Sequence, residues 1–220
     1  MNFHVITIFP GMFKSYLDDS ILARAIKNKK ITVAFYNPRD FAFDKHKKVD
    51  DRPYGGGPGM VMMAEPILRA MASAKIKIKK KKRDASKAKI IIFSPKGKKF
   101  TNTYARALAK KYKDIILVSG RYEGIDARVK KILKAEEVSI GDYILTGGEL
   151  PAMVMIDAIA RQNKGVLGKF ESLEENRVSS SVIYTRPETL VYKGKKYKVP
   201  KVLLSGHAKN IEEWKKKRED

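Results

Sequence analysis

The sequence contains no cysteine, which excludes disulfide bonds and thiolate-bound metals. Its three histidines, His4, His46 and His207, are scattered without metal-ligand spacing, so we expect no metal site built from them. No apolar run is long enough to span a membrane. The first segment lacks the basic start of a signal peptide and is broken by Pro10 and Gly11. We therefore expect a cytoplasmic protein that does not act at a membrane.

Acidic residues are few relative to basic ones. The chain has 24 Asp and Glu against 47 Lys and Arg, which leaves a net charge of +23. Such an excess predicts attraction to a polyanion, with nucleic acid as the first candidate. A basic surface that serves only solubility is the alternative, and charge alone does not separate the two. The 43% of hydrophobic residues is enough for a packed core.

Two common nucleotide-binding signatures are also missing. No G-x-G-x-x-G follows a predicted strand, which argues against a dinucleotide-binding fold, and no G-x-x-x-x-G-K-[ST] predicts a phosphate-binding loop. The glycine-rich string YGGGPGM at 54–60 has no lysine directly after it. Taken alone, this string predicts only a tight turn.

Short apolar runs rich in β-branched residues alternate with longer patterns of helical period. Strands are predicted at Val5–Phe9, Ile31–Tyr36, Lys89–Phe93, Asp114–Ser119 and Val138–Leu145. Helices are predicted at Met12–Asn28, Glu65–Lys75, Thr101–Tyr112, Gly124–Leu133 and Pro151–Gln162. This alternation predicts an α/β fold with a mostly parallel sheet. The lysine-rich run at 75–89 is expected to be a solvated loop, because like charges repel and extend the chain. The end of the chain around Trp214 is expected to be a short charged helix.

Three segments end predicted strands with unusual polar and glycine content. They are FSPKG at 93–97, SGRYEGID at 119–126 and SIGDYILTGGELPAM at 139–153. In a parallel sheet, ligands bind where the carboxyl ends of strands converge. Glycine lets the backbone approach a ligand closely. One such segment would indicate only a turn, but three in one chain predict a binding site.

Several long strings occur in an order typical of one enzyme family. They are DDRPYGGGPGMVM at 50–62, SGRYEGID, SIGDYILTGGELPAM, GVLG at 165–168 and YTRPE at 184–188. Over nearly its whole length the chain resembles bacterial tRNA (guanine-37-N1)-methyltransferases, members of the SPOUT superfamily. The resemblance implies a deep C-terminal trefoil knot in the sheet and a homodimer with active sites built across its interface. It also implies a knotted methyltransferase domain at 1–165, a catalytic and interdomain loop at 166–187, and a shortened C-terminal helical region at 188–220.

The resemblance implies an RNA-binding enzyme of tRNA modification, which transfers a methyl group from S-adenosyl-L-methionine to N1 of guanosine-37. The implied cofactor-binding residues are Ser94, Pro95, Gly120, Glu123, Ile140, Gly141, Asp142, Tyr143, Ile144, Leu145, Gly147, Gly148 and Pro151. Glu123 could also interact with Mg²⁺. Its alternative role is to cap the helix predicted to begin near Gly124.

The implied catalytic residues depart from the family pattern. Arg161 matches the arginine that faces guanine O6 or the proton acceptor. The family's general base is an aspartate after GVLG, and Asn176 stands at that place here. Because an amide cannot accept the N1 proton at neutral pH, Glu174 or Glu175 could serve if the loop is shifted. An active methyltransferase is therefore the first hypothesis. A catalytically impaired homologue that binds cofactor and tRNA is the second, and a basic RNA-binding module without cofactor is the third.

Overall fold

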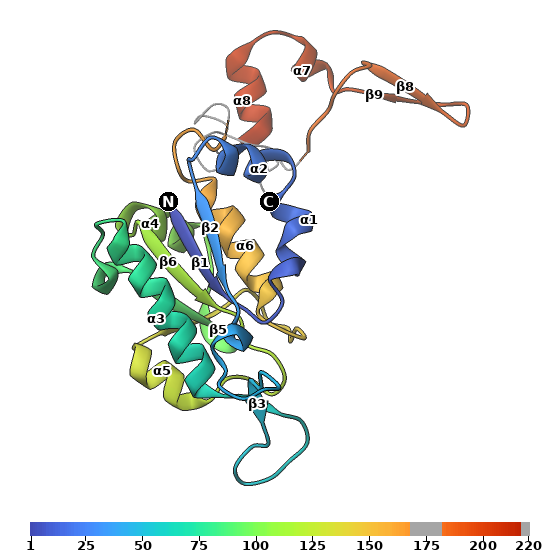
Figure 1. Ribbon diagram of the computed structural model, residues 1–220. Coiled ribbons are helices and arrows are strands. Elements are labelled where there is room, and N and C mark those ends of the chain that lie inside the picture. Colours follow the sequence, from blue (N-terminus) through green and yellow to red (C-terminus); the bar gives the residue numbers. More distant parts are fainter. Residues whose placement is uncertain (168–181, 217–220) are drawn as a thin grey trace. The chain divides into compact units, whose positions relative to one another are not determined.

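The computed structural model describes residues 1–167 and 182–216, which belong to two compact units, Met1–Leu167 and Gly168–Asp220. Each unit has its own helices and strands (Figure 1). Among the described residues, no helix is both long enough and apolar enough to cross a bilayer.

A five-stranded parallel sheet forms the centre of the first unit. In spatial order its strands are β2 (Thr32–Tyr36), β1 (Asn2–Ile6), β6 (Asp114–Val118), β5 (Lys89–Lys99) and β7 (Glu136–Ser139). Every neighbouring pair is parallel. Each of the five predicted strands overlaps one of these. The predicted α/β fold with a mostly parallel sheet is therefore confirmed.

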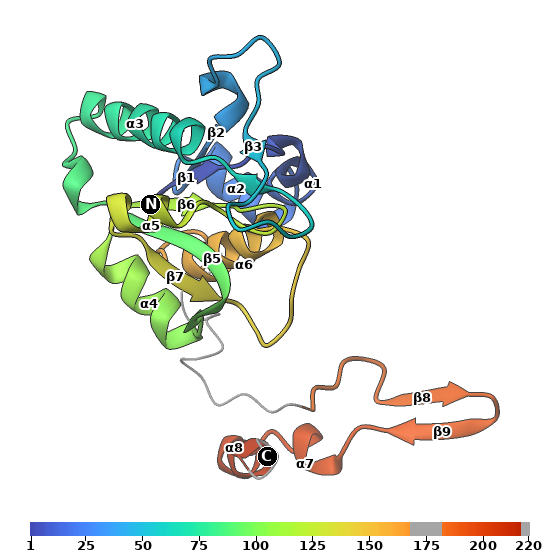
Figure 2. The ribbon, with the colours of Figure 1, turned by 90° about the horizontal axis from the view of Figure 1, so that it is seen from below.

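Helices cover both faces of the sheet, because successive side chains of a strand point to opposite faces. In β6, Ile115 and Leu117 belong to one buried cluster, and Ile116 and Val118 belong to the other. The first cluster includes residues of α1 (Lys14–Leu17), α2 (Ser20–Lys27), α4 (Asn102–Lys111) and α6 (Glu149–Ala160). The second includes residues of α3 (Ala64–Lys80) and α5 (Ala127–Leu133). Figure 2 shows α3 on one side of the sheet and α4 and α6 on the other.

The helix predicted at Met12–Asn28 is wrong in its continuity. A 3-10 turn at Pro10–Phe13 (η1) leads into α1, and α2 follows as a separate helix. Ser20 at the junction has a φ of 54°, which the interior of a right-handed helix excludes. Asp19 caps α2 by accepting a hydrogen bond from the Ser20 amide at 2.6 Å. Apolar spacing does not predict the break, because both helices bury residues in the same cluster.

The lysine-rich run expected to be a loop is partly helical. Helix α3 continues to Lys80, and a 3-10 turn at Ala85–Lys87 (η3) precedes β5. Ile78 within this run is fully buried and shares a helix face with Met71 and Ala74. Burial of this apolar face therefore outweighs repulsion between the exposed lysines.

Short elements surround the glycine-rich string at 54–60. Strands β3 (Asp50–Asp51) and β4 (Val61–Met62) pair antiparallel on either side of it. A further 3-10 turn at Pro38–Phe41 (η2) follows β2, and its cap residue Asn37 accepts a hydrogen bond from the Arg39 amide.

The second unit contains a β hairpin followed by two helices. Strands β8 (Thr189–Tyr192) and β9 (Lys195–Lys198) pair antiparallel. Helices α7 (Lys201–Leu204) and α8 (Ala208–Lys216) come next, and α8 contains the expected helix around Trp214. The hairpin was not predicted, because its lysines interrupt the apolar pattern expected of a strand.

Candidate cofactor site

A cavity of about 570 Å³ opens beside the carboxyl ends of β6 and β7 and the irregular middle of β5. Its lining comes from three stretches of chain, at 92–95, 120–130 and 137–151. Each of these stretches overlaps one of the polar and glycine-rich segments that the sequence singles out. The structure therefore brings the three segments together at one place, where a parallel sheet is expected to bind ligands.

All of the cofactor residues implied by the resemblance except Asp142 line this cavity. They are Ser94, Pro95, Gly120, Glu123, Ile140, Gly141, Tyr143, Ile144, Leu145, Gly147, Gly148 and Pro151. The exposed Asp142 carboxylate instead accepts a hydrogen bond from Lys99 Nζ at 3.0 Å. The side chain of Asp142 thus turns to a surface ion pair.

Glycines let the loops after β6 and β7 lie against each other. The Gly148 amide donates to the Gly120 carbonyl at 2.9 Å. A Cβ atom at Gly148 would lie 2.7 Å from Ser119 Cα, so a side chain there would collide with backbone. A Cβ atom at Gly141 would instead meet the Tyr143 side chain. Gly148 is therefore required for the close approach of two backbones that shape the cavity wall.

A buried ion pair supports the same wall. Glu149, the first residue of α6, is fully buried. One of its carboxylate oxygens accepts a hydrogen bond from Arg121 Nε at 2.8 Å, and the other accepts from the Thr7 hydroxyl at 2.7 Å. This arrangement pairs the buried charge and satisfies its acceptor oxygens, as burial of a carboxylate requires.

Arg121 also contacts two further segments of the chain. Its guanidinium donates to the Thr146 carbonyl at 3.3 Å and lies 3.0 Å from Met12 Sδ. The guanidinium carbon also lies 4.8 Å from the centre of the Phe9 ring. Arg121 lines the cavity, yet sequence reasoning did not select it. The string SGRYEGID contains Arg121 and could have marked it as a site residue. Its buried partner Glu149, however, is 28 residues away along the chain.

Glu123 does not have the alternative role considered for it. Helix α5 begins at Ala127, and Asp126 caps it by accepting a hydrogen bond from the Arg128 amide at 2.9 Å. Glu123 instead packs against Gly59, where a Cβ atom would come within 2.7 Å of its side chain. Its amide donates to the Met60 carbonyl at 3.0 Å. The glycine-rich string is therefore more than a turn, because it supports the cavity wall that carries Glu123.

Three acidic residues line the cavity, and two of them have cationic partners. Asp126 pairs with Arg128 at 2.6 Å, and this hydrogen bond lowers the pKa of Asp126. Glu137 pairs with Lys130 at 2.6 Å. Within the described residues, no group of three or more His, Asp or Glu side chains is arranged to hold a metal ion. Glu123 is the third acidic residue of the lining.

The implied catalytic residues lie at or beyond the end of the first unit. Arg161 is half-buried and follows the last turn of α6. One turn before it, Asp157 accepts a hydrogen bond from the Tyr16 hydroxyl, which raises the pKa of Tyr16 to about 12. Glu174, Glu175 and Asn176 lie outside the described residues.

Comparison with known proteins agrees with the resemblance seen in the sequence. Residues 1–220 match the sequence model of the family described as tRNA (Guanine-1)-methyltransferase TrmD. A Pseudoalteromonas atlantica protein named tRNA (guanine-N(1)-)-methyltransferase is 47% identical over 219 residues, which are 98% of this chain and 78% of the relative. A Haemophilus influenzae (strain PittGG) protein of the same name is 48% identical over 217 residues, covering 97% and 84%. The chain therefore belongs to the TrmD family of tRNA (guanine-1)-methyltransferases.

Proposed function

We propose that this protein transfers a methyl group from S-adenosyl-L-methionine to N1 of guanosine-37 in tRNA. The observation that carries the proposal is the glycine-lined cavity, which unites the three strand-end segments in a chain of this family. The net charge of +23 suits an RNA substrate. The cytoplasm is the proposed location, because the proposed substrate is tRNA.

The cavity suits a nucleoside-sized cofactor. Its volume of about 570 Å³ falls within the usual range of small-molecule sites. Gly120, Gly141 and Gly148 bring backbone without side chains to the cavity wall, where a ligand could approach it closely. The proposed cofactor residues are the lining residues named above, and Asp142 contributes through its backbone between Gly141 and Tyr143. The partly exposed Tyr143, Ile144 and Leu145 supply apolar surface for the ligand to cover.

The reaction needs a base and a stabilised oxygen. As the methyl carbon bonds to guanine N1, its bond to sulfur breaks, the N1 proton leaves, and negative charge develops toward O6. Orientation and electrostatic stabilisation supply most of the acceleration in such steps. We assign Arg161 to the stabilisation of O6. A general base typically adds about 10²–10⁴-fold.

A carboxylate from the loop after GVLG is the proposed base. Glu171, Glu174 and Glu175 are the candidates, and Asn176 occupies the position of the family aspartate. A glutamate reaches one methylene farther than an aspartate, so a neighbouring position could serve. Glu→Gln changes at the three positions should each be assayed for single-turnover methyl transfer, beside Asn176→Asp. One Glu→Gln change should slow transfer. If none does and Asn176→Asp accelerates it greatly, the substitute-glutamate assignment is wrong.

The direct test of function is a methylation assay. The protein is incubated with S-adenosyl-L-methionine and a tRNA transcript that carries guanosine-37, and the digested product is analysed by mass spectrometry. We expect 1-methylguanosine, and none when the transcript carries adenosine at that position. A product methylated elsewhere, or no binding of the cofactor by calorimetry, would contradict the proposal.

A catalytically impaired homologue is the second candidate, and Asn176 favours it. It would bind cofactor and tRNA without transferring the methyl group. Single-turnover assays at saturating concentrations separate the two candidates, because only the impaired protein would show binding by calorimetry and no methylated product.

Assembly as a homodimer is proposed from the resemblance, with an interface that includes α6 and the glycine segments before it. Leu150 and Val154 on α6 and Ile144 in the preceding loop are exposed apolar side chains that a partner could cover. Sedimentation should show a dimer at micromolar concentration. An active monomer would remove this proposal.

The trefoil knot and the domain limits are likewise proposed. The knot rests on the resemblance to the SPOUT superfamily and on membership of the TrmD family. We propose the knotted domain at 1–165, the catalytic loop at 166–187 and the C-terminal region at 188–220.

Mg²⁺ is proposed only as an auxiliary ion. Glu123 would be its protein ligand, since Asp126 and Glu137 are held in ion pairs. One carboxylate with several waters is a common way for proteins to hold Mg²⁺.

A further inference from the structure

The hairpin of β8 and β9 has a defined turn and register. Lys193 and Gly194 connect the strands, with φ values of 48° and 76°. Two consecutive positive φ values are typical of the type I′ turn, whose twist matches that of the flanking strands. The register pairs Tyr192 with Lys195 and continues to Thr189 and Lys198. The side chains that share each face of the hairpin are therefore known.

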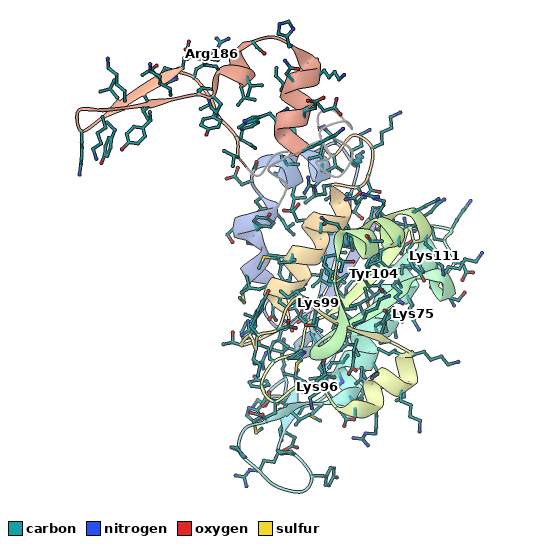
Figure 3. The ribbon with its side chains drawn as sticks, turned by 180° about the vertical axis from the view of Figure 1, so that it is seen from behind. Lys75, Lys96, Lys99, Tyr104, Lys111 and Arg186 are labelled. Carbon is teal, nitrogen blue, oxygen red and sulfur yellow. The ribbon has the colours of Figure 1, made fainter. Side chains whose placement is uncertain are left out.

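One face of the hairpin carries two tyrosines beside a lysine. Residues directly opposite each other in an antiparallel pair project to the same side. Leu190 opposes Tyr197, and Tyr192 opposes Lys195, so these four side chains share a face. Tyr192 is 59% exposed and Tyr197 is 54% exposed. Figure 3 shows side chains standing away from both sides of this ribbon.

The charge of the hairpin has one sign. Residues 189–198 include four lysines and no Asp or Glu. Lys193 Nζ lies 5.5 Å from the centre of the Tyr192 ring. Within the described part of the chain, no ion pair joins these lysines to a carboxylate. An isolated two-stranded hairpin is marginally stable in water, so a bound partner would stabilise this one. The exposed tyrosines and the lysines without carboxylate partners favour a partner that supplies both flat rings and negative charge.

We infer that the β8–β9 hairpin is an RNA-binding surface that stacks unpaired bases on Tyr192 and Tyr197 and contacts phosphates through its lysines. Single-stranded nucleic acid is recognised by this combination, since every base has a flat face and every nucleotide carries a phosphate. An apolar protein surface would leave the lysine charges unpaired. The identification of the RNA as the anticodon loop of tRNA rests on the proposed function.

The tyrosines give the first test. Binding of the full chain to a fluorescent anticodon stem-loop is measured by anisotropy for wild type, Tyr192→Ala and Tyr197→Ala. Loss of one stacked base should weaken binding about 5- to 150-fold. The matched controls Tyr192→Phe and Tyr197→Phe keep the ring and should bind nearly as wild type. Unchanged affinity in both alanine variants would overturn the inference.

The lysines give the second test. The triple change of Lys193, Lys195 and Lys196 to Gln is compared with the same change at Lys79, Lys80 and Lys81, which are exposed at the end of α3. Each lost phosphate contact lowers the slope of log affinity against log salt by about 0.7, so the hairpin triple should lose about 2. The α3 triple removes equal charge and should change the slope less. Equal changes in both triples would show that charge acts without a site.

Two further measurements separate the possible failures. Sedimentation of the tyrosine variants reports whether the hairpin instead contacts a second copy of the chain, and dissociation of a dimer with unchanged RNA affinity would overturn the inference. Methylation by wild type is assayed separately. A wild type that methylates guanosine-37 while hairpin variants bind normally disproves the hairpin surface alone. A wild type that binds through the hairpin without methylating disproves only the proposed function.

Discussion

The two ends of the central sheet each bury a carboxylate, and their surroundings differ. At the carboxyl ends of the strands, Glu149 contacts Thr7 and Arg121. At the opposite end, Asp114 is the first residue of β6 and contacts His4 Nε2 at 3.1 Å and Arg83 at 2.9 Å. The two carboxylate side chains are 1% and 5% exposed. Burial and pairing of charge are therefore common to both ends.

The two ends of the sheet differ in whether the buried ion pair borders the cavity. Arg121 lines the cavity, and Gly147 and Gly148 lie directly before Glu149. In the Asp114 cluster, His4 also contacts Tyr36, whose hydroxyl lies 3.1 Å from His4 Nδ1. Among the described residues that line the cavity, none comes from this second cluster. The cavity and the glycine backbone, and not the burial of a charge, therefore distinguish the Glu149 end of the sheet from the Asp114 end.

The largest effect is expected for Glu149→Ala. This change leaves Arg121 partly buried without its carboxylate partner, and breaking a buried pair typically costs about 3–5 kcal/mol. Because Arg121 also holds the Thr146 carbonyl, cofactor affinity should fall together with stability. Chemical denaturation and calorimetry with S-adenosyl-L-methionine measure the two effects.

Glu137→Ala is the matched control for Glu149→Ala. Glu137 also lines the cavity, but its ion pair with Lys130 is partly exposed, so stability should change by about 1 kcal/mol or less. Equal losses of stability in the two variants would contradict the importance given to burial of Glu149.

Asp114→Asn should separate stability from binding. It removes the charge that pairs with Arg83 and weakens the hydrogen bond with His4, and we expect a loss of about 1–3 kcal/mol in the free energy of unfolding. Cofactor affinity should stay at the wild-type value at temperatures well below the melting point. A selective loss of cofactor affinity with normal stability would show that the two ends of the sheet are coupled.

His4 makes the Asp114 end sensitive to pH. Burial lowers the pKa of His4 from its usual value near 6.5, and the hydrogen bond to Asp114 opposes this only in part. The unfolded chain therefore binds a proton at a higher pH than the folded chain does. Stability is fully present above about pH 6.5 and is lost as the pH falls below it. His4→Gln should flatten this part of the pH profile, measured by denaturation from pH 7.5 to 5. If the dependence of stability on pH is the same in His4→Gln as in wild type, the conclusion that His4 is buried and neutral is wrong.

The sheet and the position of the cavity were predictable because they depend on local patterns. Fully buried strands such as β6 are continuously apolar, and the alternation with helices predicts a parallel sheet. Ligand sites in such sheets form where strands end, so the glycine-rich segments indicated the cavity before its geometry was known.

Other features depend on contacts that local patterns do not record. Arg121 and Glu149 are 28 residues apart along the chain, so neither residue indicates the pair by itself. The Ser20 conformation separates two helices whose apolar spacing is continuous. The charge of the lysine-rich run at 75–89 predicts an extended chain, but burial of Ile78 favours a helix in its first part, within α3. The base among Glu171, Glu174 and Glu175 stays a prediction.

The smallest effect is expected at the rim of the cavity, where Asp142 and Lys99 form an exposed ion pair. Their side chains are 88% and 66% exposed. Such a pair is worth about 0–1 kcal/mol and is screened by salt. Asp142→Asn and Lys99→Gln should therefore change stability by about 1 kcal/mol or less, and both should leave cofactor affinity near the wild-type value if Asp142 contributes only its backbone. Denaturation and calorimetry at low and high salt measure this. A large loss of cofactor affinity in Asp142→Asn, with no loss in Lys99→Gln, would mean that the carboxylate leaves Lys99 and contacts the cofactor directly.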